Sequence, residues 1–117
     1  MPKILTTALL FTMTATAAQA QTPAQGLSHE LARHRAASIS DLEYDLTFRI
    51  QAAREERIEG DATIRFTLDD LSQPLVLDFD PVDPQVQAVT VGGTAVPFEL
   101  VNGHIVVPAA SLRAGAN

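Results

Sequence analysis

The 117-residue chain contains no cysteine and only one lysine, Lys3. Without cysteine the chain forms no disulfides, so its fold depends on core packing or on a larger partner. Cationic residues are scarce, because 8 Lys and Arg face 14 Asp and Glu and leave a net charge of −6. This acidic balance argues against binding to nucleic acids or to anionic lipid surfaces, both of which favour basic patches.

Several signatures of chemistry are also missing. The sequence has no Gly-x-Ser-x-Gly nucleophile elbow and no glycine-rich phosphate loop, since Gly92-Gly93 is only a turn signal. Beyond the N-terminal leader, no apolar run approaches the ~20 residues that a membrane-spanning helix needs. The composition therefore predicts no catalytic, cofactor-binding or metal-binding residue in this chain.

The first twenty residues have the pattern of a secretory signal peptide. Lys3 supplies a positive start, residues 4–18 are apolar or small, and Ala18-Gln19-Ala20 forms a cleavage site. A transmembrane helix is the alternative, but the run is short and rich in threonine. We expect cleavage before Gln21, export to the periplasm or beyond, and a mature chain one unit more negative because Lys3 is lost.

The mature chain divides into an arm and one domain. Residues 21–37 form the arm, in which Pro23 and Gly26 indicate a flexible start and Ser28 is a candidate N-cap for a short helix over 27–37. Residues 38–117 form a single β-domain. Its size permits only a modest core.

Two long amphipathic strands begin this domain. Apolar and polar residues alternate over 42–50 and again over 58–68, and residues 52–56 connect the two runs as a hairpin. We expect the even-numbered residues to face the core, so that Phe48 and Phe66 are both buried. A lone hairpin is marginal in water, so further strands must cover it.

Four shorter strands are predicted to follow, over 75–79, 86–91, 95–101 and 104–107, with a loop over 109–117. Gly92-Gly93 and Asn102-Gly103 are hairpin signals, and Pro97 indicates an edge or a bulge. In the third strand Leu75, Leu77 and Phe79 are expected to face inward. The predicted fold is all-β, an antiparallel sandwich or curved sheet of about six strands, with 104–107 as an exposed, aggregation-prone edge.

His29, Glu30 and His34 are the first candidate site. They resemble the His-Glu-x-x-His motif of zinc peptidases, but that motif spaces its histidines four residues apart and these lie five apart. On a helix this rotates the second imidazole by about 140° from the first. We therefore interpret the three residues as a surface helix.

Acidic residues form the other candidates. Asp78, Asp80 and Asp83 crowd one loop, but the glycine and closing glutamate of an EF-hand are missing, so turn chemistry before two prolines is favoured over a calcium site. Further charges alternate along the outward faces of the first two strands, where cross-strand pairing explains them. They are Glu43, Asp45, Glu59, Asp61, Arg49, Arg57 and Arg65.

A series of short strings runs through the domain in a fixed order. It starts at Arg35-Ala36 and at the stretch from Ile39 to Leu46. It continues through Ile58-x-Gly60 with Ala62 to Phe66, then Leu75 to Phe79, and Val89-Thr90-Val91-Gly92-Gly93. It ends at Leu112-x-x-Gly115-x-Asn117. Each string alone is weakly specific, but in order and spacing together, over 35–117, they resemble the N-terminal domain of the aminopeptidase N family of zinc metallopeptidases.

The resemblance implies a non-catalytic β-domain that packs on the catalytic domain of an exported aminopeptidase. The family's Gly-Ala-Met-Glu-Asn strand and its zinc-binding His-Glu-x-x-His helix belong to that next domain and do not occur here. No catalytic or zinc residue is carried over, and zinc belongs to the parent enzyme alone. The chain is thus expected to be an inactive fragment. The alternative is a free-standing periplasmic β-domain that binds a protein partner.

Overall fold

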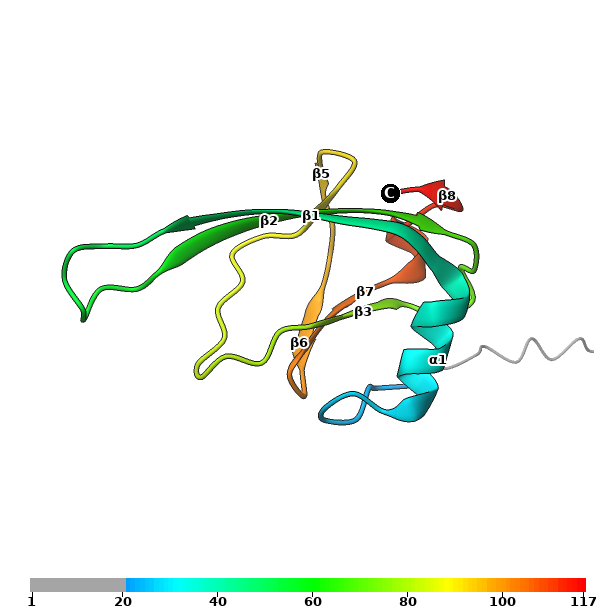
Figure 1. Cartoon of the computed structure of the whole chain (residues 1–117). Coiled ribbons are helices and arrows are strands. Elements are labelled where there is room, and N and C mark those ends of the chain that lie inside the picture. Colours follow the sequence, from blue (N-terminus) through cyan, green and yellow to red (C-terminus); the bar gives the residue numbers. More distant parts are fainter. Residues whose placement is uncertain (1–20) are drawn as a thin grey trace, which may run out of the picture.

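The computed structural model describes residues 21–117, so the predicted leader and its cleavage site lie outside the described residues. Strands predominate among its regular elements and form antiparallel sheets, which confirms the predicted all-β class (Figure 1). The elements in chain order are α1 (His29–Ser38), β1 (Ile39–Arg49), β2 (Glu59–Leu68), β3 (Leu75–Asp78), β4 (Thr90–Val91), β5 (Thr94–Ala95), β6 (Glu99–Val101), β7 (His104–Val107), the 3₁₀ turn η1 (Ala109–Ser111) and β8 (Gly115–Ala116).

Ser28 caps helix α1, as the sequence predicts, although the helix spans His29–Ser38 and not 27–37. The Ser28 hydroxyl accepts a hydrogen bond from the Leu31 backbone N–H at 3.1 Å, which satisfies one of the free donors of the first turn. Glu30 lies in the first turn and Arg35 in the last, so both charges complement the helix dipole. The chain passes from Ser38 directly into β1, so the helix lies at one end of the hairpin (Figure 1).

Strands β1 and β2 form the predicted long hairpin, in which Tyr44 is opposite Ile64 and Phe48 is opposite Gly60. The pairing is regular from Glu43 to Arg49. It is irregular between Ser40 and Glu43, where Asp41 has a positive φ of 52°. This bulge-like irregularity ends the straight part of the hairpin near the helix.

The loop predicted over 109–117 contains structure instead. Strand β8 pairs with Thr67 and Leu68 of β2, and Asn117 exchanges backbone hydrogen bonds with Phe66 at 2.8 and 3.1 Å. The Asn117 side-chain amide also donates to the carbonyls of Arg113 and Gly115. These bonds close a tight turn that hydropathy alone does not reveal.

The second sheet has the strand order β3-β7-β6. β7 lies in the centre, so the prediction that 104–107 is an exposed edge is wrong. The strand expected over 95–101 is split into β5 and β6, with Pro97 between them, and the one expected over 86–91 shrinks to β4. The Asn102-Gly103 turn is confirmed, because both residues have positive φ, 50° and 77°.

The core lies between the helix-side half of the hairpin and the second sheet. Its buried apolar side chains are Phe66, Leu68, Val76 and Val107. The inward assignment for β3 is wrong, since Val76 is buried while Leu77 is half-buried and Phe79 is exposed. Phe48 is 62% exposed, so its predicted burial is also wrong. The physical reason is visible in Figure 1, where the hairpin extends past the sheet that covers its other end.

Candidate functional site: the apolar face of the hairpin

The most unusual surface of the described chain is a row of apolar side chains along the β1–β2 hairpin. Each member is more than half exposed, although each stands at an inward position of the alternating pattern. The row, called here the apolar row, consists of Leu42, Tyr44, Leu46, Phe48, Ile50 and Ile58. Contiguous exposed apolar surface of this kind is typical of interaction sites.

Phe48, in this row, packs against a glycine of the neighbouring strand. Its ring lies over Gly60 of the neighbouring strand, and a Cβ at Gly60 would come within 2.9 Å of the ring carbon Cδ1. The missing side chain at residue 60 therefore leaves room for the ring beside the β2 backbone. At this outer end of the row, no segment of residues 21–117 buries the ring, which is 62% exposed.

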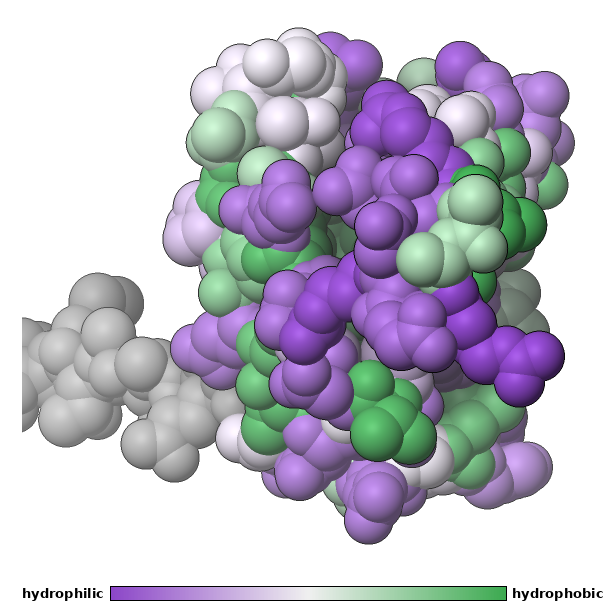
Figure 2. Space-filling view, turned by 90° about the vertical axis from the view of Figure 1, so that its left-hand side faces the viewer, coloured by the Kyte–Doolittle hydropathy of each residue, from purple (hydrophilic) through white to green (hydrophobic). Residues whose placement is uncertain are grey.

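Toward the helix, the hairpin face becomes one wall of a groove of about 420 Å³. Leu42, Tyr44, Ile64 and Phe66 of the hairpin line it, and Val76 and Asp78 of β3 form the opposite wall. The view along the hairpin shows green apolar residues lying between purple hydrophilic ones (Figure 2). Leu42 and Tyr44 belong both to the groove and to the apolar row, so the two surfaces are continuous.

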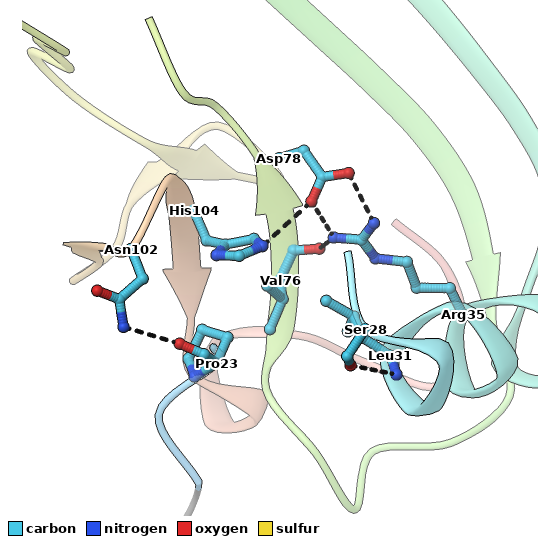
Figure 3. Close-up of polar contacts among 8 residues, drawn as sticks. All are labelled: Pro23, Ser28, Leu31, Arg35, Val76, Asp78, Asn102 and His104. Carbon is cyan, nitrogen blue, oxygen red and sulfur yellow. Dashed lines mark hydrogen bonds and ion pairs between the residues drawn. The ribbon is translucent and has the colours of Figure 1, made fainter. Parts of the chain in front are cut away.

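A polar cluster closes the helix end of this groove (Figure 3). The Arg35 guanidinium donates to both carboxylate oxygens of Asp78, at 2.8 and 2.9 Å, and to the Val76 carbonyl at 2.6 Å. These hydrogen bonds lower the pKa of Asp78, although partial desolvation opposes the effect. The cluster joins α1 to β3 and leaves Asp78 ionised, with both oxygens occupied.

His104 completes the cluster from β7. Its Nε2 lies 3.4 Å from Oδ1 of Asp78, and the residue is only 2% exposed. Its Nδ1 is buried and has no hydrogen-bond partner within residues 21–117. Because Asp78 contacts both Arg35 of α1 and His104 of β7, the three side chains link the helix to the second sheet.

The structure does not bring the zinc-like trio of the sequence into a site. All three residues lie on α1, where His29 and Glu30 are exposed and His34 is half-buried. Within residues 21–117, no group of three His, Cys, Asp or Glu side chains lies close enough to hold a metal ion. We therefore assign no zinc site to His29, Glu30 and His34.

The three aspartates that crowd one loop in the sequence have separate roles. Asp78 binds Arg35, and Asp83 accepts a hydrogen bond from Arg57 at 2.9 Å. The Asp80 side chain lies against Gly103, whose Cβ, if present, would meet it at 2.8 Å. The second of these contacts also shows that Arg57 pairs with the loop and not across the hairpin.

Only part of the predicted cross-strand pairing of the remaining outward charges is present. Arg49 lies 3.4 Å from Glu59 and 3.8 Å from Asp61. Glu43 stands opposite Arg65 in the register, and Asp45 stands opposite the uncharged Thr63. All of these groups are exposed, so each pair contributes little to stability. They leave the outward face of the hairpin hydrophilic, in contrast to the apolar row.

Sequence reasoning missed the Arg35–Asp78–His104 cluster. The only signal was indirect, because a pairing of 75–78 with 104–107 places Asp78 opposite His104. The position of Arg35 depends on how the helix packs, which no local pattern encodes.

Comparison with protein-family models, curated proteins and solved structures finds no match to this chain. In the described residues, no helix combines the length and the apolar character that crossing a bilayer requires. The features of this chain that bear on its function are therefore the apolar row, the groove and the resemblance in sequence.

Proposed function

We propose that this chain is a non-catalytic β-domain that packs on the catalytic domain of an exported zinc aminopeptidase. The parent enzyme would remove N-terminal residues from peptides, with zinc and the general base supplied by the catalytic domain. In this proposal the chain acts in the periplasm or outside the cell. The chain would form part of the wall of the substrate cavity and would bind the catalytic domain, but would supply no catalytic residue.

The observation that carries the proposal is the apolar row. Six apolar side chains, each more than half exposed, face away from the hydrophilic side of the same hairpin. Fully burying such side chains stabilises a contact by about 1.5–3 kcal/mol each, before the costs of association. A surface of this kind fits a domain–domain contact, which is the role that the aminopeptidase N resemblance assigns to this stretch.

The polar features of the chain also fit a supporting role. The cluster of Arg35, Asp78 and the buried His104 joins α1 to the second sheet. The outward charges are paired on a solvated face. Neither arrangement presents a free nucleophile beside a base, which covalent catalysis requires.

The first test is the genomic DNA that follows the codon for Asn117. The proposal predicts a reading frame, in phase or shifted, that encodes Gly-Ala-Met-Glu-Asn and then His-Glu-x-x-His. Downstream DNA that encodes neither motif would contradict the proposal and favour a free-standing module that binds a protein partner.

The second test uses that downstream region as the binding partner. Co-expressed with the full chain in the periplasm, it should co-purify with the chain, and Phe48→Asp should abolish this. Thr47→Asp is the matched control, because it adds the same charge one residue away on the outward face and should leave co-purification intact. Equal retention of both variants would show that the apolar row is not the docking face.

A third test concerns activity. The chain alone, supplied with zinc and a panel of amino-acid anilides, should release no product above a mock preparation. Chelator-sensitive release would show a peptidase site in this chain and would overturn the non-catalytic assignment.

A further inference from the structure

Strand β1 has a free edge that the sequence did not single out. Within residues 21–117 it pairs only with β2, so its other side presents unpaired backbone groups. The regular part of the strand runs from Glu43 to Arg49, beyond the irregularity that contains Asp41. No proline or glycine interrupts this part. Such an edge is a template for another strand.

We propose that a second copy of this chain occupies this edge, with the two β1 strands antiparallel about a two-fold axis at Leu46. In an antiparallel pair, directly opposed residues face the same side of the sheet. A two-fold axis also makes the contact self-complementary. With the axis at Leu46, residue 43 is opposite residue 49 of the other copy, and the whole regular part of β1 is paired.

The charges on the outward face support this register. Glu43 of each copy meets Arg49 of the other, which gives two opposite-charge pairs by symmetry. Asp45 meets Thr47, so no like charges oppose each other. Cross-strand pairs of opposite charge stabilise a sheet, and like charges directly opposite destabilise it.

The apolar face supports the same register. Tyr44 of each copy stands opposite Phe48 of the other, and the two Leu46 side chains meet at the axis. These residues are 56%, 62% and 53% exposed in the single chain, so all have apolar surface to lose. Aromatic cross-strand pairs are among the favourable ones. The dimer would join the two apolar rows into one wider surface, so this inference goes beyond the proposed function and does not depend on it.

The other symmetric registers fit less well. An axis at Tyr44 places Glu43 against Asp45 twice. An axis at Asp45 places the two Asp45 carboxylates together. An axis at Thr47 opposes Asp45 to Arg49 but pairs only residues 45–49. The axis at Leu46 is the one that pairs the regular strand completely and opposes no like charges.

Oligomeric state gives the first test. In sedimentation velocity of the full chain, the weight-average mass should rise from monomer to dimer with concentration and stop there. A monomer at all concentrations up to about 1 mM, the weak end of measurable affinities, would overturn the proposal. Growth beyond the dimer would also overturn it, because a two-fold contact is closed.

Single-cysteine variants map the axis, and the chain has no native cysteine to interfere. Under mild oxidation Leu46→Cys should form disulfide-linked dimers, because opposed residues lie within disulfide range. Asp45→Cys and Thr47→Cys should cross-link at least about ten-fold more slowly, since their symmetry mates are diagonal neighbours roughly 7–8 Å or more apart. Fastest cross-linking at 45 or 47 would contradict the proposed axis.

Charge reversal tests the same contact without a cross-link. Glu43→Arg places two positive charges opposite each other at both 43–49 contacts of the dimer. It should therefore raise the dimer dissociation constant about ten-fold or more. Thr63→Arg adds a positive charge to the same face on β2, away from the edge, and should leave the dissociation constant within about two-fold. Melting curves recorded at concentrations too low for dimerisation check that both variants fold. Equal weakening by both changes would indicate a net-charge effect and would count against the register.

Discussion

The two ends of the β1–β2 hairpin share one sequence pattern but have opposite environments. At the helix end, Phe66 is 7% exposed and Leu68 is 4% exposed, because α1, β8 and the second sheet surround them. At the loop end, Phe48 and Ile58 occupy equivalent positions and are 62% and 63% exposed. Alternation therefore decides which side of a strand is apolar, and a second layer decides whether that side is buried.

The largest expected difference between the two ends is in stability. Phe66→Ala should lower the free energy of unfolding by about 3–5 kcal/mol, as for buried phenylalanines in general. Phe48→Ala should cost about 1 kcal/mol or less, because most of the ring is already in water. Denaturant unfolding of dilute chain measures both, with Thr47→Ala as an outward control. Equal losses at residues 48 and 66 would show that the loop end is covered.

A smaller contrast should separate the ion pairs of the two ends. Arg35→Ala removes three hydrogen bonds that join α1 to β3, and we expect a loss of about 1–2 kcal/mol. Arg49→Ala at the loop end removes only exposed pairs and should cost less than about 0.5 kcal/mol. If the Arg49 change proved as costly in urea unfolding, the helix end would have no special polar anchor.

The pH dependence of that anchor has a defined sign. Because Arg35 lowers the pKa of Asp78 below its ordinary value near 3.8, the folded state binds this proton less readily than the unfolded state. The resulting stability is present above pH 4 and is lost as the pH falls through the lowered pKa.

The stability gap between wild type and Asp78→Asn should therefore be full at pH 6 and shrink below about pH 4. Because Asp78 is 56% exposed, solvent screening keeps the gap small. Urea unfolding of both proteins across this pH range measures it. Arg35→Ala should remove the pH-dependent part, and a gap that widened in acid would contradict the assigned cause.

Much of the local structure could be predicted from sequence. Ser28 caps α1, the alternation places β1 and β2, and Asn102-Gly103 forms its turn, because each depends on residues close together in the chain. The predictions that were wrong involve distant segments. Phe48 is exposed because no layer extends over it, and β7 is central because β3 pairs with it across an interval of about thirty residues.

The same reasoning accounts for the remaining errors. Leu75, Val76 and Leu77 are consecutive apolar residues, so alternation alone does not decide which side of β3 faces the core, and in the structure it is Val76 that is buried. The exposure of the apolar row could not be predicted from the sequence for a related reason. A strand pattern cannot distinguish an apolar face that is buried from one that awaits a partner.

The smallest expected effect is at Gly60. An alanine there would press on the Phe48 ring at 2.9 Å, but that ring is exposed and can turn away. We expect Gly60→Ala to change the free energy of unfolding by less than about 0.5 kcal/mol, the range typical of surface changes. Thermal melts measure it. A loss of several kcal/mol would mean that the ring is held by something above it.

The central claim is that the apolar row is open in the isolated chain and closed only by another protein. Thiol reactivity tests it most directly, since the chain has no cysteine of its own. In dilute solution, Phe48→Cys should react with a thiol reagent within about ten-fold of a free thiol. Phe66→Cys should react at least about a hundred-fold more slowly, because it must wait for an opening of the fold. Equal protection at both positions would contradict the claim.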